Sequence, residues 1–204
     1  MRFALAFVDW NAQIINHAAT LREQPVRCAE QTLERTARTI ERTLLSWSQT
    51  ERFRVTLRLY HGWHKGYEPT ANRRAVGQMV AGMDFSLLPR SNTVVFSSEV
   101  QFGDRLIDAL PTRLHSRLGI HLPNTLRVQR KEDGPIEKMV DTSIAADLLS
   151  WARTSPSEDA LILTEDDDLV PAVYVAEAWV SASSSRICLI RHRRSSRPLK
   201  FAER

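Results

Sequence analysis

Acidic side chains follow apolar segments at separate places in this chain, and they are the residues best suited to chemistry. Asp9 directly follows the apolar run 2–8, and Asp166 and Asp168 follow the run 160–163 within the sequence TEDDDLV. Asp141 lies in the first turns of an amphipathic segment. Carboxylates that lie close together repel one another, and a divalent cation removes that penalty. Oxygen-only ligands favour Mg²⁺ or Mn²⁺ over zinc, so the pattern predicts a metal site that activates water for attack on a phosphodiester.

The elements that must position these acids are predicted from hydrophobic periodicity. Strands are expected at 2–8, 55–60, 93–96, 125–129, 160–163 and 186–190. Helices are expected at 25–48, 70–83, 104–118, 135–151 and 169–180, with Pro135 at the start of its helix. Strands that alternate with helices predict an α/β fold with a mainly parallel sheet and helices on both faces. The acids then fall at the carboxyl ends of strands, where open sheets bind their ligands.

Composition limits the class of protein. The 204 residues are 43% hydrophobic and 25% charged, which excludes a disordered chain, a collagen-like fibre and a disulfide scaffold. No apolar stretch approaches the length of about 18 residues that a membrane span needs, so no membrane association is expected. Cys28 and Cys188 are far apart in the sequence and show no metal-ligand spacing, which favours a reducing, cytoplasmic setting. The net charge is +4, and most of the basic residues are arginine. This composition mildly favours nucleic acid as a partner.

The chain shows no internal repeat and no long linker, so residues 1–190 are expected to form a single domain. Residues 61–124 have the least regular pattern, and we interpret them as a possible insertion or substrate-specificity region. Residues 191–204 form a basic C-terminal tail. The tail is either a solvated terminus or an arm that contacts phosphates.

Three blocks of this sequence resemble the NYN family of PIN-like metal-dependent ribonucleases. They are FVDWN at 7–11, EKMVDTSIAADLL at 137–149 and LILTEDDDLVP at 161–171, and their order and spacing also fit the family. The resemblance implies a Rossmann-like (PIN-like) sheet, metal-dependent cleavage of RNA, and Mg²⁺ or Mn²⁺ as the cofactor. It also implies which residues are catalytic and hold the metal: Asp9, Asp141, Asp166 and Asp168. Met139 and Glu165 depart from the pattern, since the family often has glycine at both places.

Further residues are candidates for supporting roles. The resemblance implies that Asn11 positions the first acid or the substrate. Lys138 either holds a phosphate or neutralises the acids, as the resemblance implies, or is a plain surface lysine. Asp147 is either a second-metal or supporting acid, or a helix-face acid with a basic partner, and Asp167 lies beside the predicted ligands. Candidates for RNA binding follow the second strand or belong to the tail: Trp63, His64, Lys65, Arg191, Arg193 and Arg194. His61 precedes them by a few residues, and no cysteine supports a zinc site there.

The preferred interpretation is a metal-dependent nuclease, an endoribonuclease acting on single-stranded or structured RNA, with a homo-oligomer as one option for its assembly. A non-catalytic RNA-binding or regulatory module on the same fold is the main alternative, since fold alone does not imply activity. Asp166 and Asp168 also form the Asp-x-Asp pattern of glycosyltransferases and Toprim-type enzymes. The former are usually longer, and the latter place glutamate where this chain has Asp9. Asp168 has a simpler alternative role as the N-cap of the helix predicted to begin at Leu169.

Overall fold

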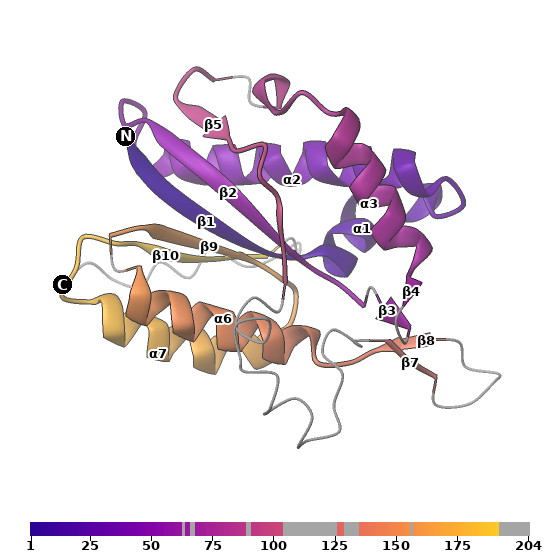
Figure 1. The fold of residues 1–204 in the computed structure, drawn as a ribbon. Coiled ribbons are helices and arrows are strands. Elements are labelled where there is room, and N and C mark those ends of the chain that lie inside the picture. Colours follow the sequence, from indigo (N-terminus) through magenta and orange to yellow (C-terminus); the bar gives the residue numbers. More distant parts are fainter. Residues whose placement is uncertain are drawn as a thin grey trace.

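Parallel strands from both halves of the chain form the central sheet of this computed structural model (Figure 1). The structure describes residues 1–62, 64–65, 68–88, 91–103, 126–128, 135–155 and 157–191. The sheet strands are β1 (Arg2–Asp9), β2 (Phe53–Tyr60), β5 (Val94–Phe96), β9 (Asp159–Leu163) and β10 (Ile187–Ile190), and β6 (Gln101–Phe102) also pairs with β2.

The order of the strands creates a switch point in the middle of the sheet. The order is β10-β9-β1-β2-β5, and every pairing among these strands is parallel. The chain therefore runs outward from β1 through β2 to β5 and then continues on the other side of β1 with β9 and β10. Ligands of open α/β sheets bind beyond the carboxyl ends of the strands at such a reversal. The predicted α/β fold with a mainly parallel sheet is confirmed, and the reversal lies between β1 and β9.

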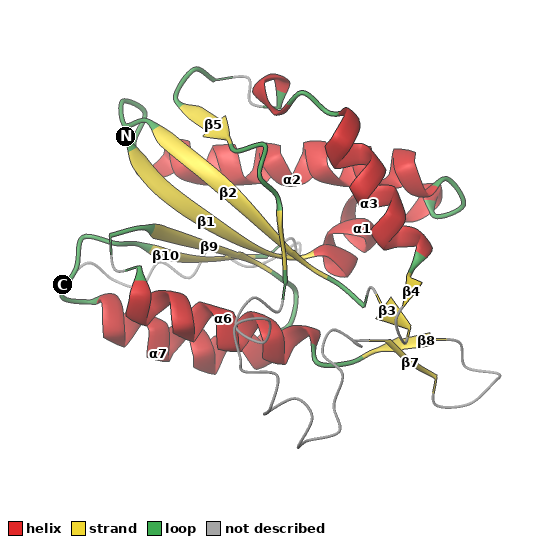
Figure 2. Ribbon diagram, viewed as in Figure 1, coloured by secondary structure: helices red, strands yellow, loops and turns green. Residues whose placement is uncertain are grey.

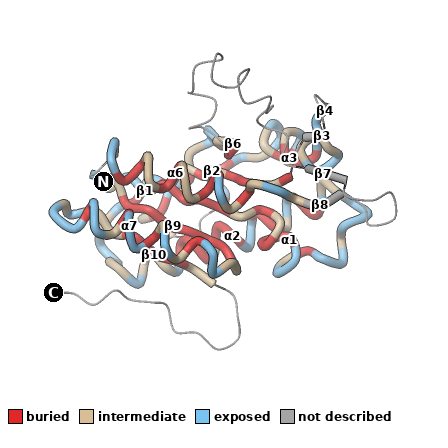
Figure 3. Tube along the Cα trace, turned by 90° about the horizontal axis from the view of Figure 1, so that it is seen from below, coloured by how far each residue is buried: buried red, intermediate tan, exposed pale blue. Residues whose placement is uncertain are grey.

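Helices cover both faces of the sheet (Figure 2). One face carries α1 (Trp10–Ala18), α2 (Pro25–Trp47) and α3 (Ala71–Gly82), and the other carries α6 (Val140–Thr154) and α7 (Val170–Val180). Side chains alternate along β1, so Ala6 and Val8 join the core under α2, whereas Leu5 and Phe7 join the core under α6. The central strands are buried along most of their length (Figure 3). Two apolar layers thus fix the ends of β1 and β9 relative to each other.

Short elements connect these layers. Single helical turns occur at η1 (Ala19–Leu21), η2 (Phe85–Leu87) and η3 (Asp167–Leu169). Two small antiparallel ribbons lie at the carboxyl edge of the sheet, one made of β3 (His64–Lys65) and β4 (Glu68–Pro69), the other of β7 (Leu126–Val128) and β8 (Pro135–Glu137). No helix in the described residues is both long and apolar enough to cross a membrane.

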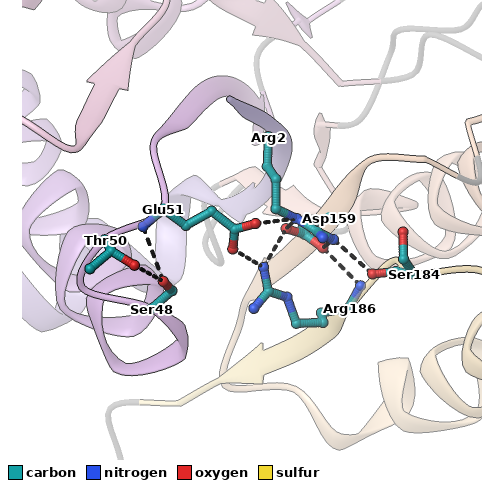
Figure 4. Close-up of polar contacts among 7 residues, drawn as sticks. All are labelled: Arg2, Ser48, Thr50, Glu51, Asp159, Ser184 and Arg186. Atoms are coloured by element: carbon teal, nitrogen blue, oxygen red, sulfur yellow. Dashed lines mark hydrogen bonds and ion pairs between the residues drawn. The ribbon is translucent and has the colours of Figure 1, made fainter.

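A network of charges ties the strands together at the amino end of the sheet (Figure 4). Asp159 is fully buried and accepts hydrogen bonds from Arg2 Nε at 2.9 Å and Nη2 at 2.7 Å. It also accepts from the backbone N–H of Arg186 at 2.9 Å and from its Nη2 at 3.3 Å. Arg186 Nη2 in turn donates to Glu51 at 3.0 Å. A buried charge is tolerated only when it is paired in this way, so this end of the sheet is structural.

Of the two predictions about the chain before α6, the helix start was wrong and the strand was confirmed outside the main sheet. The helix predicted at 135–151 begins at Val140, because residues 135–137 pair with β7 instead. Met139, with φ of 64°, turns the chain between the ribbon and the helix. The strand predicted at 125–129 exists as β7, but it belongs to that ribbon and not to the main sheet. The helix predicted at 104–118 lies outside the described residues, and α1 was not predicted at all.

Candidate functional site

Asp9 ends β1 at the switch point and begins α1. Its Oδ1 accepts a hydrogen bond from the backbone N–H of Ala12 at 3.1 Å, as an N-cap does. Its Oδ2 accepts from Thr164 Oγ1 at 3.4 Å. The contact follows from the register, since Val8 pairs with Leu163 and the next residues of the two strands therefore lie level. Asp9 is thus held by groups from both sides of the reversal.

The acidic loop after β9 is built around Asp166. The backbone N–H of Asp166 donates to Thr164 Oγ1 at 3.1 Å, and Asp166 Oδ1 accepts from the backbone N–H of Asp168 at 2.8 Å. Asp166 therefore caps η3, and the alternative in which Asp168 caps the following helix is wrong. Asp168 itself is exposed. The neighbouring Glu165 accepts a hydrogen bond from Asn16 Nδ2 at 3.1 Å, which joins this loop to α1.

Asp141 enters the site from the first turn of α6. The residue before this helix, Met139, has a left-handed backbone conformation, with φ of 64° and ψ of 6°. An L-residue pays about 1–2 kcal/mol for that conformation and glycine does not. Glycine, which the resemblance to the NYN family implies at this place, would adopt this conformation without that cost. The strained residue forms the sharp turn that places Lys138 and Asp141 at the carboxyl edge of the sheet.

The predicted residues from separate parts of the sequence line one open cleft of about 600 Å³. The described residues that line it with polar side chains are Asp9, Asn11, Glu137, Lys138, Asp141, Glu165, Asp166 and Asp167. Three of the four predicted metal-holding acids are among them, together with the predicted supporting residues Asn11, Lys138 and Asp167. Asp168 is adjacent in sequence but is not part of this lining.

Burial and mutual repulsion raise the pKa of two acids in this cleft, Asp9 and Asp141. Burial is the main cause for Asp9, whose pKa rises to about 6 although the hydrogen bond from Ala12 opposes the rise. The carboxylates of Glu137 and Asp141 raise it further. Burial also raises the pKa of Asp141, with a contribution from the charge of Asp166. The acids therefore act on one another electrostatically, which is the situation that a bound cation relieves.

Glu137 is a cleft residue that the sequence interpretation did not single out. Its Oε1 accepts hydrogen bonds from His61 Nδ1 and from the backbone N–H of Gly62, the latter at 2.7 Å. Burial acts to raise its pKa, but these bonds and one from the Asn11 side chain outweigh it, so the pKa of Glu137 is below its ordinary value. The sequence signal that could have identified Glu137 as a site residue was its position next to Lys138. The pairing with His61, distant in the sequence, had no local signature.

Asp147 lies away from the acids of the cleft. It is 2% exposed, accepts a hydrogen bond from Tyr60 Oη at 2.7 Å, and has Arg58 Nη1 at 3.5 Å. It lines a separate cavity between α6 and β2, together with Arg58 and Trp151. Of the two roles considered for Asp147, the structure therefore supports the helix acid with a basic partner.

The predicted RNA-binding residues are only partly described. Arg191 directly follows β10 at the carboxyl edge and forms an ion pair with Asp167. His64 and Lys65 belong to β3, which pairs with β4 at the carboxyl edge of the sheet. Trp63, Arg193 and Arg194 lie outside the described residues.

Comparison with known proteins identified no relative: no family model, no curated protein and no solved structure matches this chain. Within the parts of the chain that the structure describes, no three His, Cys, Asp or Glu side chains are grouped closely enough to hold a metal ion as they stand. The acids thus share a cleft and an electrostatic field, and the resemblance to NYN ribonucleases remains a prediction.

Proposed function

We propose that this protein is a metal-dependent ribonuclease whose active site is the acidic cleft at the switch point of the sheet. One observation carries the proposal: Asp9, Asp141 and Asp166 arrive from three separate segments and line the same cleft. Their position beyond the carboxyl ends of β1 and β9 is where open α/β sheets bind ligands. The NYN-like motifs, which were recognised from the sequence alone, fall on these same residues.

The donor chemistry of the cleft fits Mg²⁺ or Mn²⁺. Its candidate ligands are carboxylate oxygens, which these ions prefer. The pKa values of Asp9 and Asp141 are raised, so these carboxylates are costly to ionise without a compensating positive charge. Asp9, Asp141 and Asp166 would hold the ion, with Asp168 as a further candidate from the loop. When bound, such an ion stabilises negative charge on the phosphate and promotes attack by water.

Other residues of the cleft would orient the carboxylates and bind the RNA. Thr164 and the N-terminus of α1 orient the Asp9 carboxylate, and Asp166 keeps its loop closed through its cap on η3. Lys138 is exposed within the cleft, where its ammonium group can contact an RNA phosphate. Arg191 lies at the same edge, where its charge favours approach of the RNA backbone.

The proposal is tested by a cleavage assay on labelled linear and circular RNA with Mn²⁺, Mg²⁺ or EDTA. Asp9→Asn and Asp166→Asn should each reduce cleavage by at least about 100-fold, as loss of a charge-stabilising active-site group does. Asp84→Asn is the matched control, because Asp84 also caps a helical turn but lies outside the cleft. Cleavage of the circular substrate would identify an endonuclease.

Other outcomes of this assay would contradict the proposed function. RNA binding without cleavage under any metal condition would favour the non-catalytic RNA-binding or regulatory module. Cleavage that persists in both cleft variants would remove the active-site assignment. A wild-type protein that neither binds nor cleaves RNA would exclude both functions.

A further inference from the structure

One carboxylate, that of Glu137, joins segments from three parts of the chain beside the acidic cleft. Its Oε1 accepts hydrogen bonds from the ring of His61 and the backbone N–H of Gly62, which follow β2 and lead into the β3–β4 ribbon. It also accepts a hydrogen bond from the side chain of Asn11 at the start of α1. Glu137 itself ends the β7–β8 ribbon. A carboxylate with several donors has a fixed orientation, so these segments are fixed relative to one another.

His61 is held in turn by α3. The side-chain amide of Asn72 lies 3.0 Å from His61 Nε2, on the opposite side of the ring from Glu137. The His61 side chain is only 7% exposed. Because both ring nitrogens are hydrogen-bonded, the imidazole has one orientation. It therefore fixes the position of α3 relative to Glu137. The hydrogen-bonded series Asn72, His61 and Glu137 therefore connects α3, the segment after β2 and the cleft.

The two ribbons adjoin the cleft through Glu137, which ends β8 and lines the cleft. We call β3–β4 and β7–β8 together the ribbon wall, in which β3 lies next to β7 (Figure 1). Glu137 is close enough to Asp9 and Asp141 to influence both electrostatically. Lys138, the next residue, is exposed in the cleft. The ribbon wall thus begins at the acids and continues away from them.

We propose that Glu137 is a positioning residue that sets the register of single-stranded RNA in the cleft by holding the ribbon wall at a fixed place beside the acids. This inference rests on the proposed ribonuclease function. If RNA binds along the ribbon wall and is cut at the acids, the distance between the wall and the acids determines which phosphodiester is cut. Glu137 performs this role as a hydrogen-bond acceptor, so an uncharged acceptor of the same shape can replace it.

The test is steady-state cleavage of a 5′-labelled single-stranded RNA with Mn²⁺, in which both the kinetic constants and the cut positions are measured. Glu137→Ala should raise KM by about 10- to 100-fold, the equivalent of losing one charge-assisted hydrogen bond, and spread cleavage over neighbouring phosphodiesters. Glu137→Gln should restore the single cut position and most of KM, because its amide oxygen still accepts from both His61 and Gly62. His61→Phe should resemble Glu137→Ala, and Asp84→Asn serves as the control outside the cleft.

Other outcomes overturn the inference. A Glu137→Ala protein with wild-type KM and cut position shows that Glu137 positions nothing. A Glu137→Gln protein whose KM rises and whose cut positions spread as much as in Glu137→Ala shows that Glu137 acts through its charge. If the wild type cleaves, Asp9→Asn does not, and Glu137→Ala is unaffected, only the positioning role fails. If the wild type does not cleave, the ribonuclease function fails and the positioning role fails with it. His61→Phe keeps the test decisive if Glu137→Ala does not fold.

Discussion

Replacing Asp9 with asparagine should make the metal-free protein more stable while removing its proposed activity. Burial raises the pKa of Asp9 from 3.8 to about 6 in the folded protein. Folding therefore favours the protonated acid and penalises the carboxylate. At about 1.4 kcal/mol per pKa unit, ionised Asp9 costs up to about 3 kcal/mol at pH 7. Asparagine is uncharged at every pH and still accepts the cap hydrogen bond from Ala12.

The sign of this effect depends on pH. The cost of ionised Asp9 is absent below pH 3.8, where the acid is protonated in both states, and is complete above pH of about 6. Asp9→Asn should thus gain up to about 3 kcal/mol at pH 7, roughly 6–12 °C in Tm for a chain of this size, and nothing at pH 3.5.

The assay is thermal and urea unfolding in EDTA at both pH values, with Asp84→Asn as the matched cap variant. Hydrogen bonds from Ser86 lower the pKa of Asp84, so that substitution should give no gain at pH 7. An Asp9→Asn protein that is less stable than the wild type at pH 7, or equally stabilised at pH 3.5, would refute the reasoning. With Mn²⁺ the order should reverse, because ligand binding stabilises only the protein that binds it.

The remaining predictions concern single residues. Asp159→Ala should cost about 1–3 kcal/mol in urea unfolding because it removes the buried acceptor of Arg2 and Arg186, whereas Glu34→Ala, which breaks an exposed helix pair, should cost under about 0.5 kcal/mol; similar losses would contradict a structural network. Met139→Gly should stabilise the protein by about 0.5 kcal/mol or more, because relief of the left-handed strain exceeds the added entropy of the unfolded chain; a lower Tm would show that the strain is not real. Asp147→Ala should destabilise by about 3 kcal/mol yet leave Mn²⁺ affinity in calorimetry unchanged, since Asp147 lies in a different cavity from the acids; a tenfold loss of affinity would return it to the metal site.

The strands that end in acids were predictable because their signal is local. The apolar runs at β1 and β9 are buried on both faces, so each reads as an uninterrupted hydrophobic segment that stops at a polar residue. Alternation of strands and helices then requires parallel pairing, which brings Asp9 and Asp166 to one edge. Both therefore line the same cleft, as the residue pattern indicated.

The segment before α6 was mispredicted because its local signal was misleading. Pro135 suits the first turn of a helix, and apolar residues at helical spacing follow it. Pairing with β7 decided otherwise, and a proline tolerates the edge of a two-stranded ribbon because it has no N–H to lose. Only the left-handed Met139 marks the true start of the helix.

The sequence by itself determined the α/β class, the parallel sheet and the edge at which the acids meet, since periodicity and chain order are properties of neighbouring residues. Tertiary structure alone decided which acids share a cleft and which do not. Asp147 is buried against Tyr60 and Arg58 on a neighbouring strand, and Glu137 is held by His61. These partners are more than 70 residues apart in the chain. Their contacts arise where α6 packs against β2 and where β8 meets the segment after β2, which no local pattern encodes.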